Sequence, residues 1–135
     1  MEALAIFSPK NFKPTGINPP VEITTALPVT VSTMEKTFVG DIQGESLTFF
    51  TAAFDHAIKI GSYIAMETFK GTVNGRTGTF NFVHSASTTG SERNDEFFCI
   101  VAGSGTNELK GISGSGEISI DSEGTHRIRL NYQLT

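Results

Sequence analysis

The sequence predicts a single, mostly antiparallel β domain, folded as a small closed or nearly closed barrel. Three observations predict this fold class. From Glu35 onward, apolar side chains recur with a period of two rather than with the helical period. Glycine-rich turns separate the runs, and Asn74-Gly75 is the strongest hairpin signal among them. No stretch shows convincing helical periodicity. A barrel is favoured over a sandwich because the strand runs are long and closure removes exposed edges.

The N-terminal region is predicted to be an irregular, Pro-rich arm with a possible first strand over residues 1–34, followed by the barrel over residues 35–135. All five prolines lie at or before Pro28, and only one of the fourteen glycines, Gly16, precedes Gly40. Proline cannot donate to a strand ladder, so it belongs at edges and connections. The first twenty residues therefore read as an arm that wraps the body, and residues 21–31 as a strand interrupted at Pro28.

Alternation predicts the barrel strands in order. Phe38, Gly40 and Ile42 fall on one face of the first run, and Gly40 and Gly44 suggest the bends that barrel closure requires. Further runs span residues 47–54, 57–71, 77–87, 96–102, 116–121 and 126–134, with a turn at 122–125 between the last two.

The Asn74-Gly75 turn fixes the register of the central hairpin. A two-residue turn of this type needs positive φ at both positions, which places Val73 opposite Arg76. Counting outward assigns the side chains of the two strands to two faces. One face carries Tyr63, Ala65, Glu67, Phe69, Phe80, Phe82 and His84. The other carries Ile60, Ser62, Ile64, Met66, Thr68, Asn81, Val83 and Ser85.

The first of these faces holds the candidate site. Glu67 and His84 are diagonal neighbours on it, roughly 7–8 Å apart between backbones and within reach of long side chains. They are the candidate catalytic residues and would act as an acid–base pair. The surrounding aromatic rings would shift the pKa values of both groups, as is common at functional sites. The alternative is a structural buried pair, or two groups that face water at the rim. The candidate ligand-binding residues are Tyr63, Phe69, Phe80 and Phe82.

The second face predicts a partner. A strand face toward solvent should not carry Ile60, Ile64, Met66 and Val83 together, so this face must meet a partner subunit or the N-terminal arm. We therefore expect a homo-oligomer.

Charge and composition exclude several classes of protein. The net charge of −4 offers no basic footprint for nucleic acid, and the alternating Arg127 and Arg129 read as a solvated strand face rather than a phosphate site. No apolar run approaches the roughly 18 residues of a membrane span. A lone Cys99 and the lack of a basic, then apolar N-terminal stretch indicate a reduced, cytoplasmic protein with no secretory signal.

No cofactor and no metal are expected. The glycine-rich segment 102–106 lacks the Lys that a phosphate-binding loop needs, and a dinucleotide-binding loop would need glycine where Glu108 stands. Both this segment and residues 113–116 read as tight connections. The histidines His56, His84 and His126 are not spaced as a local metal site.

Three motif groups carry a resemblance to a known family. They are the hairpin residues 63–71 and 74–80 with His84, the segment 101–114, and the segment 38–46. Together they resemble an uncharacterised bacterial family, domain of unknown function 3224, whose barrel is similar to allene oxide cyclase. The resemblance covers about residues 35–134 and implies a barrel of about eight strands with a central cavity. It implies no established activity.

Three functions remain open. The leading hypothesis is a barrel that binds a small, largely apolar ligand in its lumen, because the aromatic face carries only a few polar groups. The second is an isomerase or cyclase that uses Glu67 and His84 as an acid–base pair. The third is a structural or protein-interaction module without a ligand, which would have a lumen filled by phenylalanine side chains.

Overall fold

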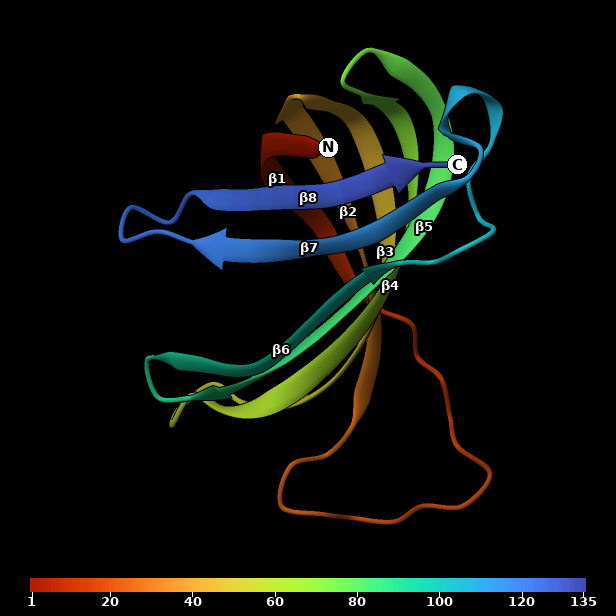
Figure 1. Ribbon diagram of the computed structural model, residues 1–135. Helices are drawn as coiled ribbons and strands as arrows, with labels where there is room; N and C mark the ends of the chain where they lie inside the picture. The colour runs from red at the N-terminus through yellow and green to blue at the C-terminus, as the bar shows by residue number, and fades with distance from the viewer.

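The computed structural model describes all 135 residues and is built of eight strands (Figure 1). A single-turn helix, η1, is its only helix, and it is far too short to cross a membrane. The elements are β1 (Glu2–Pro14), β2 (Thr30–Gly40), β3 (Ile42–Asp55), β4 (Ile60–Val73), β5 (Arg76–Thr89), β6 (Glu92–Ile100), η1 (Asn107–Leu109), β7 (Ile112–Ile120) and β8 (His126–Leu134).

The strands form one antiparallel sheet that closes on itself in chain order, with β1 paired to β8. The all-β barrel predicted from the sequence is therefore confirmed. The seam between β6 and β7 is short, because only Cys99 with Ser115 and Ile100 with Gly114 are paired across it. Beyond these pairs the β5–β6 and β7–β8 hairpins splay apart (Figure 1). The barrel thus has a well-closed end at the Asn74-Gly75 turn and an open end opposite it.

The N-terminal region differs from the predicted arm, because residues 2–14 form β1, which pairs with both β2 and β8. Ala3, Ala5 and Phe7 point into the core. Beyond Phe7 the strand pairs with β2 alone, and prolines are tolerated along such a free edge. The irregular part is the loop 15–29, and the strand predicted at 21–31 begins only at Thr30.

The central hairpin has the predicted register. Val73 pairs with Arg76, Phe69 with Phe80, Glu67 with Phe82 and Ala65 with His84. Asn74 and Gly75 have φ values of 48° and 80°, as the two-residue turn requires. The face that carries Glu67 and His84 points into the barrel, and the face that carries Ile64 and Met66 points outward.

The core fills the closed end of the barrel. Its phenylalanine rings form a continuous series of contacts, with centroid separations of 5.5 Å from Phe38 to Phe69, 5.2 Å from Phe69 to Phe80, 6.0 Å from Phe80 to Phe82 and 5.1 Å from Phe82 to Phe98. Aromatic pairs in this range add favourable contacts to the burial itself. The lumen at this end is therefore packed with side chains.

Residues 113–116 form part of β7 rather than the tight connection predicted from the sequence. A Cβ on Gly114 would lie 2.1 Å from the carbonyl oxygen of Asn131, and one on Gly116 would lie 2.8 Å from the Phe98 ring. Glycine stands at these two positions because β8 and the Phe98 ring come too close to leave room for a side chain. Glycine within a strand often marks such a close approach.

Candidate functional site

Glu67 lies at the centre of a buried polar network in the middle of the barrel. Its side chain is completely buried. Lys36 Nζ donates to Oε2 at 2.6 Å, Ser46 Oγ donates to Oε1 at 2.8 Å, and His84 Nε2 lies 2.5 Å from Oε2. Strands β2, β3 and β5 thus each place one donor against a carboxylate on β4. The predicted proximity of Glu67 and His84 is confirmed as direct contact.

The network continues from His84 toward the open end of the barrel. Tyr63 OH lies 2.8 Å from His84 Nδ1, and Arg93 donates from Nη2 to the Tyr63 oxygen at 2.7 Å. Arg93 Nε in turn donates to Glu96 at 2.5 Å. We call Lys36, Ser46, Glu67, His84, Tyr63 and Arg93 the polar network. It runs from a fully buried carboxylate to a guanidinium whose side chain is 31% exposed.

The pKa values of Glu67, His84 and Tyr63 are shifted by burial and by their neighbours. Burial raises the pKa of Glu67, but the hydrogen bond from His84 and the charge of Lys36 outweigh it and lower the pKa to about 2. Burial lowers the pKa of His84, more than Glu67 raises it. Burial also raises the pKa of Tyr63, against the opposing effect of Arg93.

At neutral pH the network therefore has one consistent pattern of protons. Glu67 is an anion beside the Lys36 cation, and His84 is neutral. A neutral His84 donates from Nε2 to Glu67 and accepts at Nδ1 from the Tyr63 hydroxyl. The Tyr63 oxygen keeps its second role as acceptor from Arg93. Every member thus has a partner, which holds Tyr63 and Arg93 in fixed positions.

A cavity of about 520 Å³, the end cavity, opens at the end of the barrel where the network terminates. Tyr63 and Arg93 belong to its polar lining, together with Thr30, His56, Ser62 and Thr88. The Phe50 ring stacks on Tyr63 at 4.9 Å, and Phe12 meets Phe50 edge-on at 6.2 Å. The apolar part of the lining consists of Phe12, Pro28, Phe50, Ala52, Phe54 and Ala86.

The splayed seam between β6 and β7 forms a second cavity, the side cavity, of about 690 Å³. His84, Arg93 and Phe98 border it from β5 and β6, and residues 116–120 of β7 border it from the other side. Arg93 lines both cavities. The polar network therefore separates two openings, with His84 next to one and Tyr63 next to the other.

The candidate residues predicted from sequence occupy different places. Tyr63 lines the end cavity, and His84 borders the side cavity. Glu67 borders neither cavity and is reached only through its three donors. Phe69, Phe80 and Phe82, predicted to bind a ligand, lie 2% exposed in the packed core of the closed end and line neither cavity. Phe82 stacks against His84, with ring centroids 6.0 Å apart.

Sequence reasoning missed Lys36, Ser46, Arg93 and Phe50. The position of Lys36 could have been predicted. It lies two residues before Phe38 on the same strand, so both side chains point into the barrel. The position of Arg93 could not have been predicted. A bulge shifts the β5–β6 register between Ser85 and Ser87, so that Arg93 faces the inward Thr88. Simple alternation from the buried Phe98 would have pointed Arg93 outward.

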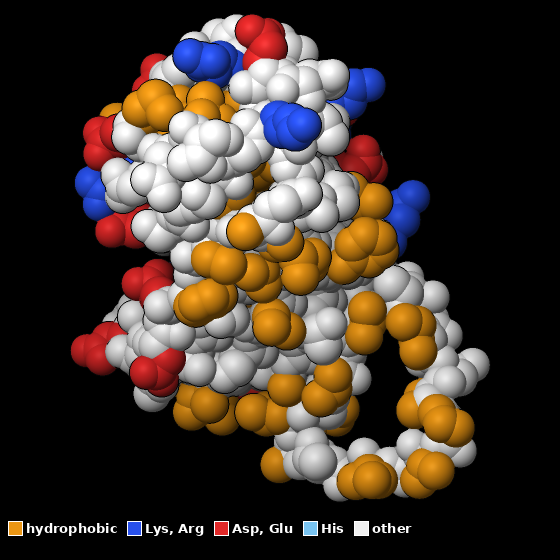
Figure 2. Space-filling model, turned by 45° about the vertical axis from the view of Figure 1, so that its right-hand side comes forward, with side chains coloured by type: hydrophobic (Ala, Val, Ile, Leu, Met, Phe, Trp, Pro, Cys, Tyr) orange, Lys and Arg blue, Asp and Glu red, His pale blue; other side chains and the backbone are white.

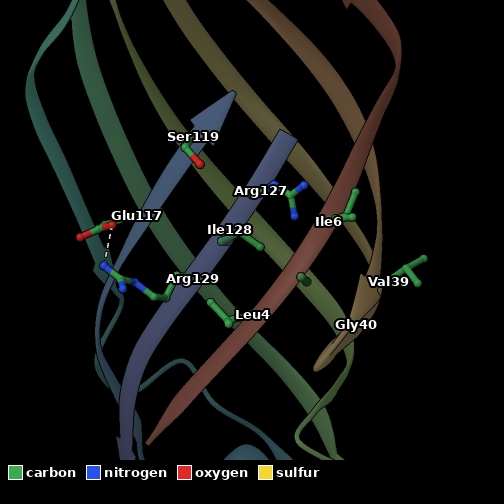
Figure 3. Close-up of a pocket in the computed structure, with 10 residues that line it drawn as sticks. Leu4, Ile6, Val39, Gly40, Glu117, Ser119, Arg127, Ile128 and Arg129 are labelled. Carbon is green, nitrogen blue, oxygen red and sulfur yellow. Dashed lines mark hydrogen bonds and ion pairs between the residues drawn. The ribbon is translucent and has the colours of Figure 1, made fainter. Parts of the chain in front are cut away.

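The predicted solvated face on β8 lies outside the barrel (Figure 3). Arg129 donates to Glu117 at 2.7 Å, and Arg127 lies 3.5 Å from Asp121. These arginines border a surface hollow of about 460 Å³ together with Leu4, which also points outward. Both cations are paired with carboxylates at the surface, as expected for a solvated strand face. No group of three or more His, Cys, Asp or Glu side chains could hold a metal ion.

The chain matches a protein-family model and a solved structure from the same family. The family model described as protein of unknown function (DUF3224) matches residues 10–132. The chain is also similar to the crystal structure of a protein with unknown function from the same family, from Shewanella oneidensis MR-1. That likeness has a TM-score of 0.83 at 24% identity and covers 100% of this chain and 98% of the other, which shows a shared fold. No functionally curated protein matches the chain.

Proposed function

The chain belongs to the DUF3224 family, and we propose that it binds a small, largely apolar ligand with one hydrogen-bond-accepting group in the end cavity. The observation that carries the proposal is the lining of this cavity. Six apolar side chains line it together with the small or neutral polar residues Thr30, His56, Ser62 and Thr88, and Arg93, hydrogen-bonded to Tyr63, is the one cation among the lining residues. A volume of about 520 Å³ lies within the roughly 300–1,000 Å³ of small-molecule sites.

Arg93 is the group that would recognise the polar end of the ligand. Its Nε and Nη2 atoms donate to Glu96 and Tyr63, whereas its Nη1 atom makes no hydrogen bond within the protein. The guanidinium also lies over the Tyr63 ring, 5.3 Å from its centroid. Arg93 lines the end cavity, and its Nη1 atom has no partner within the protein, so this donor suits a carbonyl, carboxylate or sulfonate oxygen of a ligand.

The buried remainder of the network supports this role by holding the cavity wall rigid. Tyr63 is fixed between His84 and Arg93 by hydrogen bonds and is stacked on Phe50. A wall that is already ordered loses little conformational entropy when a ligand binds. The resemblance of the sequence to allene oxide cyclase-like barrels stays a prediction and adds support only at the level of fold.

Titration with anilinonaphthalene sulfonate, an apolar dye with one anionic group, tests the proposal. We expect saturable fluorescence enhancement with the folded protein. Ala52→Phe should weaken binding at least about tenfold, because the half-buried Ala52 lines the cavity and a ring would fill part of it. Arg93→Gln should weaken it by removing the charged donor.

Ala102→Phe is the matched control for Ala52→Phe. Ala102 is exposed in the connection before η1, and the same change there adds an equal ring away from the cavity. Equal dye affinity for the two alanine variants would place the dye elsewhere and contradict the proposal. No saturable binding at all would favour a module that works without a ligand.

A second candidate function is acid–base catalysis of an isomerisation. It is favoured by one observation, namely that His84 borders the side cavity while its Nε2 atom contacts the Glu67 carboxylate. In this candidate His84 would transfer the proton and Glu67 would act as its positioning residue. The test is deuterium incorporation beside the carbonyl of an apolar ketone, measured by NMR. Incorporation no faster than with His84→Asn would contradict it.

A further inference from the structure

The outward side chains of β3 to β6 form a continuous apolar surface that no part of the chain covers. We call it the outer band, and it consists of Leu47, Phe49, Ile64, Met66, Val83 and Phe97. Five of these side chains, all except Val83, are 39–54% exposed. Figure 2 shows hydrophobic side chains gathered across the middle of the molecule. Contiguous surfaces of this kind on soluble proteins mark interaction sites.

The strand register makes the outer band continuous. Phe49 pairs with Met66, and Met66 pairs with Val83 in the next strand. Ile64 and Phe97 both pair with Ser85 and so lie on either side of it.

Charge is absent from the band and returns only at its margin. Thr51, Thr68 and Asn81 complete the surface between the apolar side chains. At the margin, Glu35 of β2 pairs with Leu47, and Glu45 and Lys70 pair with each other beyond Leu47. A chain with a net charge of −4 can therefore place this band against a second copy without burying a charge.

The loop 15–29 is a second uncovered apolar element. Ile17, Val21, Ile23 and Val29 are 66–82% exposed. The loop extends away from the open end of the barrel (Figure 1), and its apolar side chains point to solvent along it (Figure 2). Main-chain hydrogen bonding ties it only at its base, where Thr15 donates to Val31.

We propose that a second copy of this chain covers the outer band, and that the loop 15–29 of one copy packs on the band of the other. Side-chain areas support both parts. Aromatic side chains offer roughly 150–250 Å² each and aliphatic ones lie near the lower end of that range, so at the observed exposures the band offers roughly 500 Å² and the loop a similar amount. A stable interface buries about 800 Å² per partner, which the band alone does not reach and the band with the loop exceeds.

Sedimentation velocity on the full chain at micromolar concentration tests the proposal. The wild type should sediment as an assembly heavier than the 14.5 kDa of one chain. Met66→Lys places a charge in the centre of the band and should shift the protein to the mass of one chain. Val39→Lys is the matched control, because Val39 is an outward β-strand residue outside the band and is 67% exposed. It should leave the assembly unchanged.

Ile23→Asp tests the loop. Ile23 is the most exposed apolar side chain of the loop, at 82%, so its replacement removes little packing within the chain. We expect at least a tenfold weaker assembly. Circular dichroism shows whether each variant is folded, and Phe49→Glu replaces Met66→Lys if the latter is not.

Three results would overturn the proposal. The first is a wild-type protein with the mass of one chain. The second is an assembly that Met66→Lys and Val39→Lys affect equally. The third is an assembly that Ile23→Asp leaves unchanged, which would remove the loop from the interface.

Discussion

Replacement of Glu67 by glutamine removes the charge at the centre of the polar network and leaves its shape almost unchanged. The Lys36 ammonium, with a side chain only 6% exposed, then has no counter-charge within the barrel. Breaking a buried ion pair in this way costs about 3–5 kcal/mol. The whole domain is expected to have about 5–15 kcal/mol of stability, so Glu67→Gln should take a large share of it.

Urea denaturation followed by circular dichroism measures this loss. Glu117→Gln serves as the matched control, because Glu117 pairs with Arg129 at the surface and its side chain is 66% exposed. An exposed pair of this kind contributes about 1 kcal/mol or less. The double variant Lys36→Met with Glu67→Gln should regain much of the loss, because neither partner then carries a buried charge.

Two results would refute this reasoning about the network. One is a stability of Glu67→Gln within about 1 kcal/mol of the wild type, similar to Glu117→Gln, which would mean that water reaches the pair. The other is a double variant less stable than Glu67→Gln alone, since the cost would then not come from the unpaired Lys36.

Two further predictions concern acid and the close contacts of the sheet. Because the pKa of Glu67 is lowered from 4.5 to about 2, its contribution of about 3 kcal/mol is present above pH 4.5 and is lost as the pH falls toward 2. The lowered pKa of His84 also removes stability as the pH falls below 6.5. The urea midpoint of the wild type should therefore fall steadily in acid. Between pH 5 and 3 the urea midpoint of Glu67→Gln should fall less steeply, because this variant has no Glu67 carboxylate to protonate. Gly44→Ala should destabilise the protein more than Gly90→Ala, because a Cβ on Gly44 meets the Lys70 carbonyl oxygen at 2.2 Å and one on Gly90 meets nothing within 4 Å. Equal thermal midpoints for the two glycine variants would contradict that explanation.

The sequence was most informative where local chemistry alone decides the structure. Asn74-Gly75 permits one turn type, and the turn fixed the register of β4 and β5 and therefore the contact between Glu67 and His84. Because side chains alternate strictly along a strand, that register also separated the inward face from the outward face that carries Met66.

The sequence was least informative where contacts between distant segments determine the structure. β1 was missed because its prolines argue against a strand, and only its pairing with β2 and β8 shows that they lie along a free edge. Lys36 was missed as a partner of Glu67 because the contact joins two residues that are 31 positions apart in the sequence, on strands that are not neighbours in the sheet. Arg93 points inward only because of a bulge near Asp95, which has a φ of 52° that its sequence context does not predict.

The position of a bound probe tests the central claim most directly. Crystals soaked with bromonaphthoate, an apolar ring system with one carboxylate, give an anomalous signal at the bromine. We predict a bromine peak between Phe50 and Phe54 and carboxylate density at Nη1 of Arg93, within the cavity of about 520 Å³. Density for the probe only outside this cavity, or an empty cavity at saturating probe, would contradict the account.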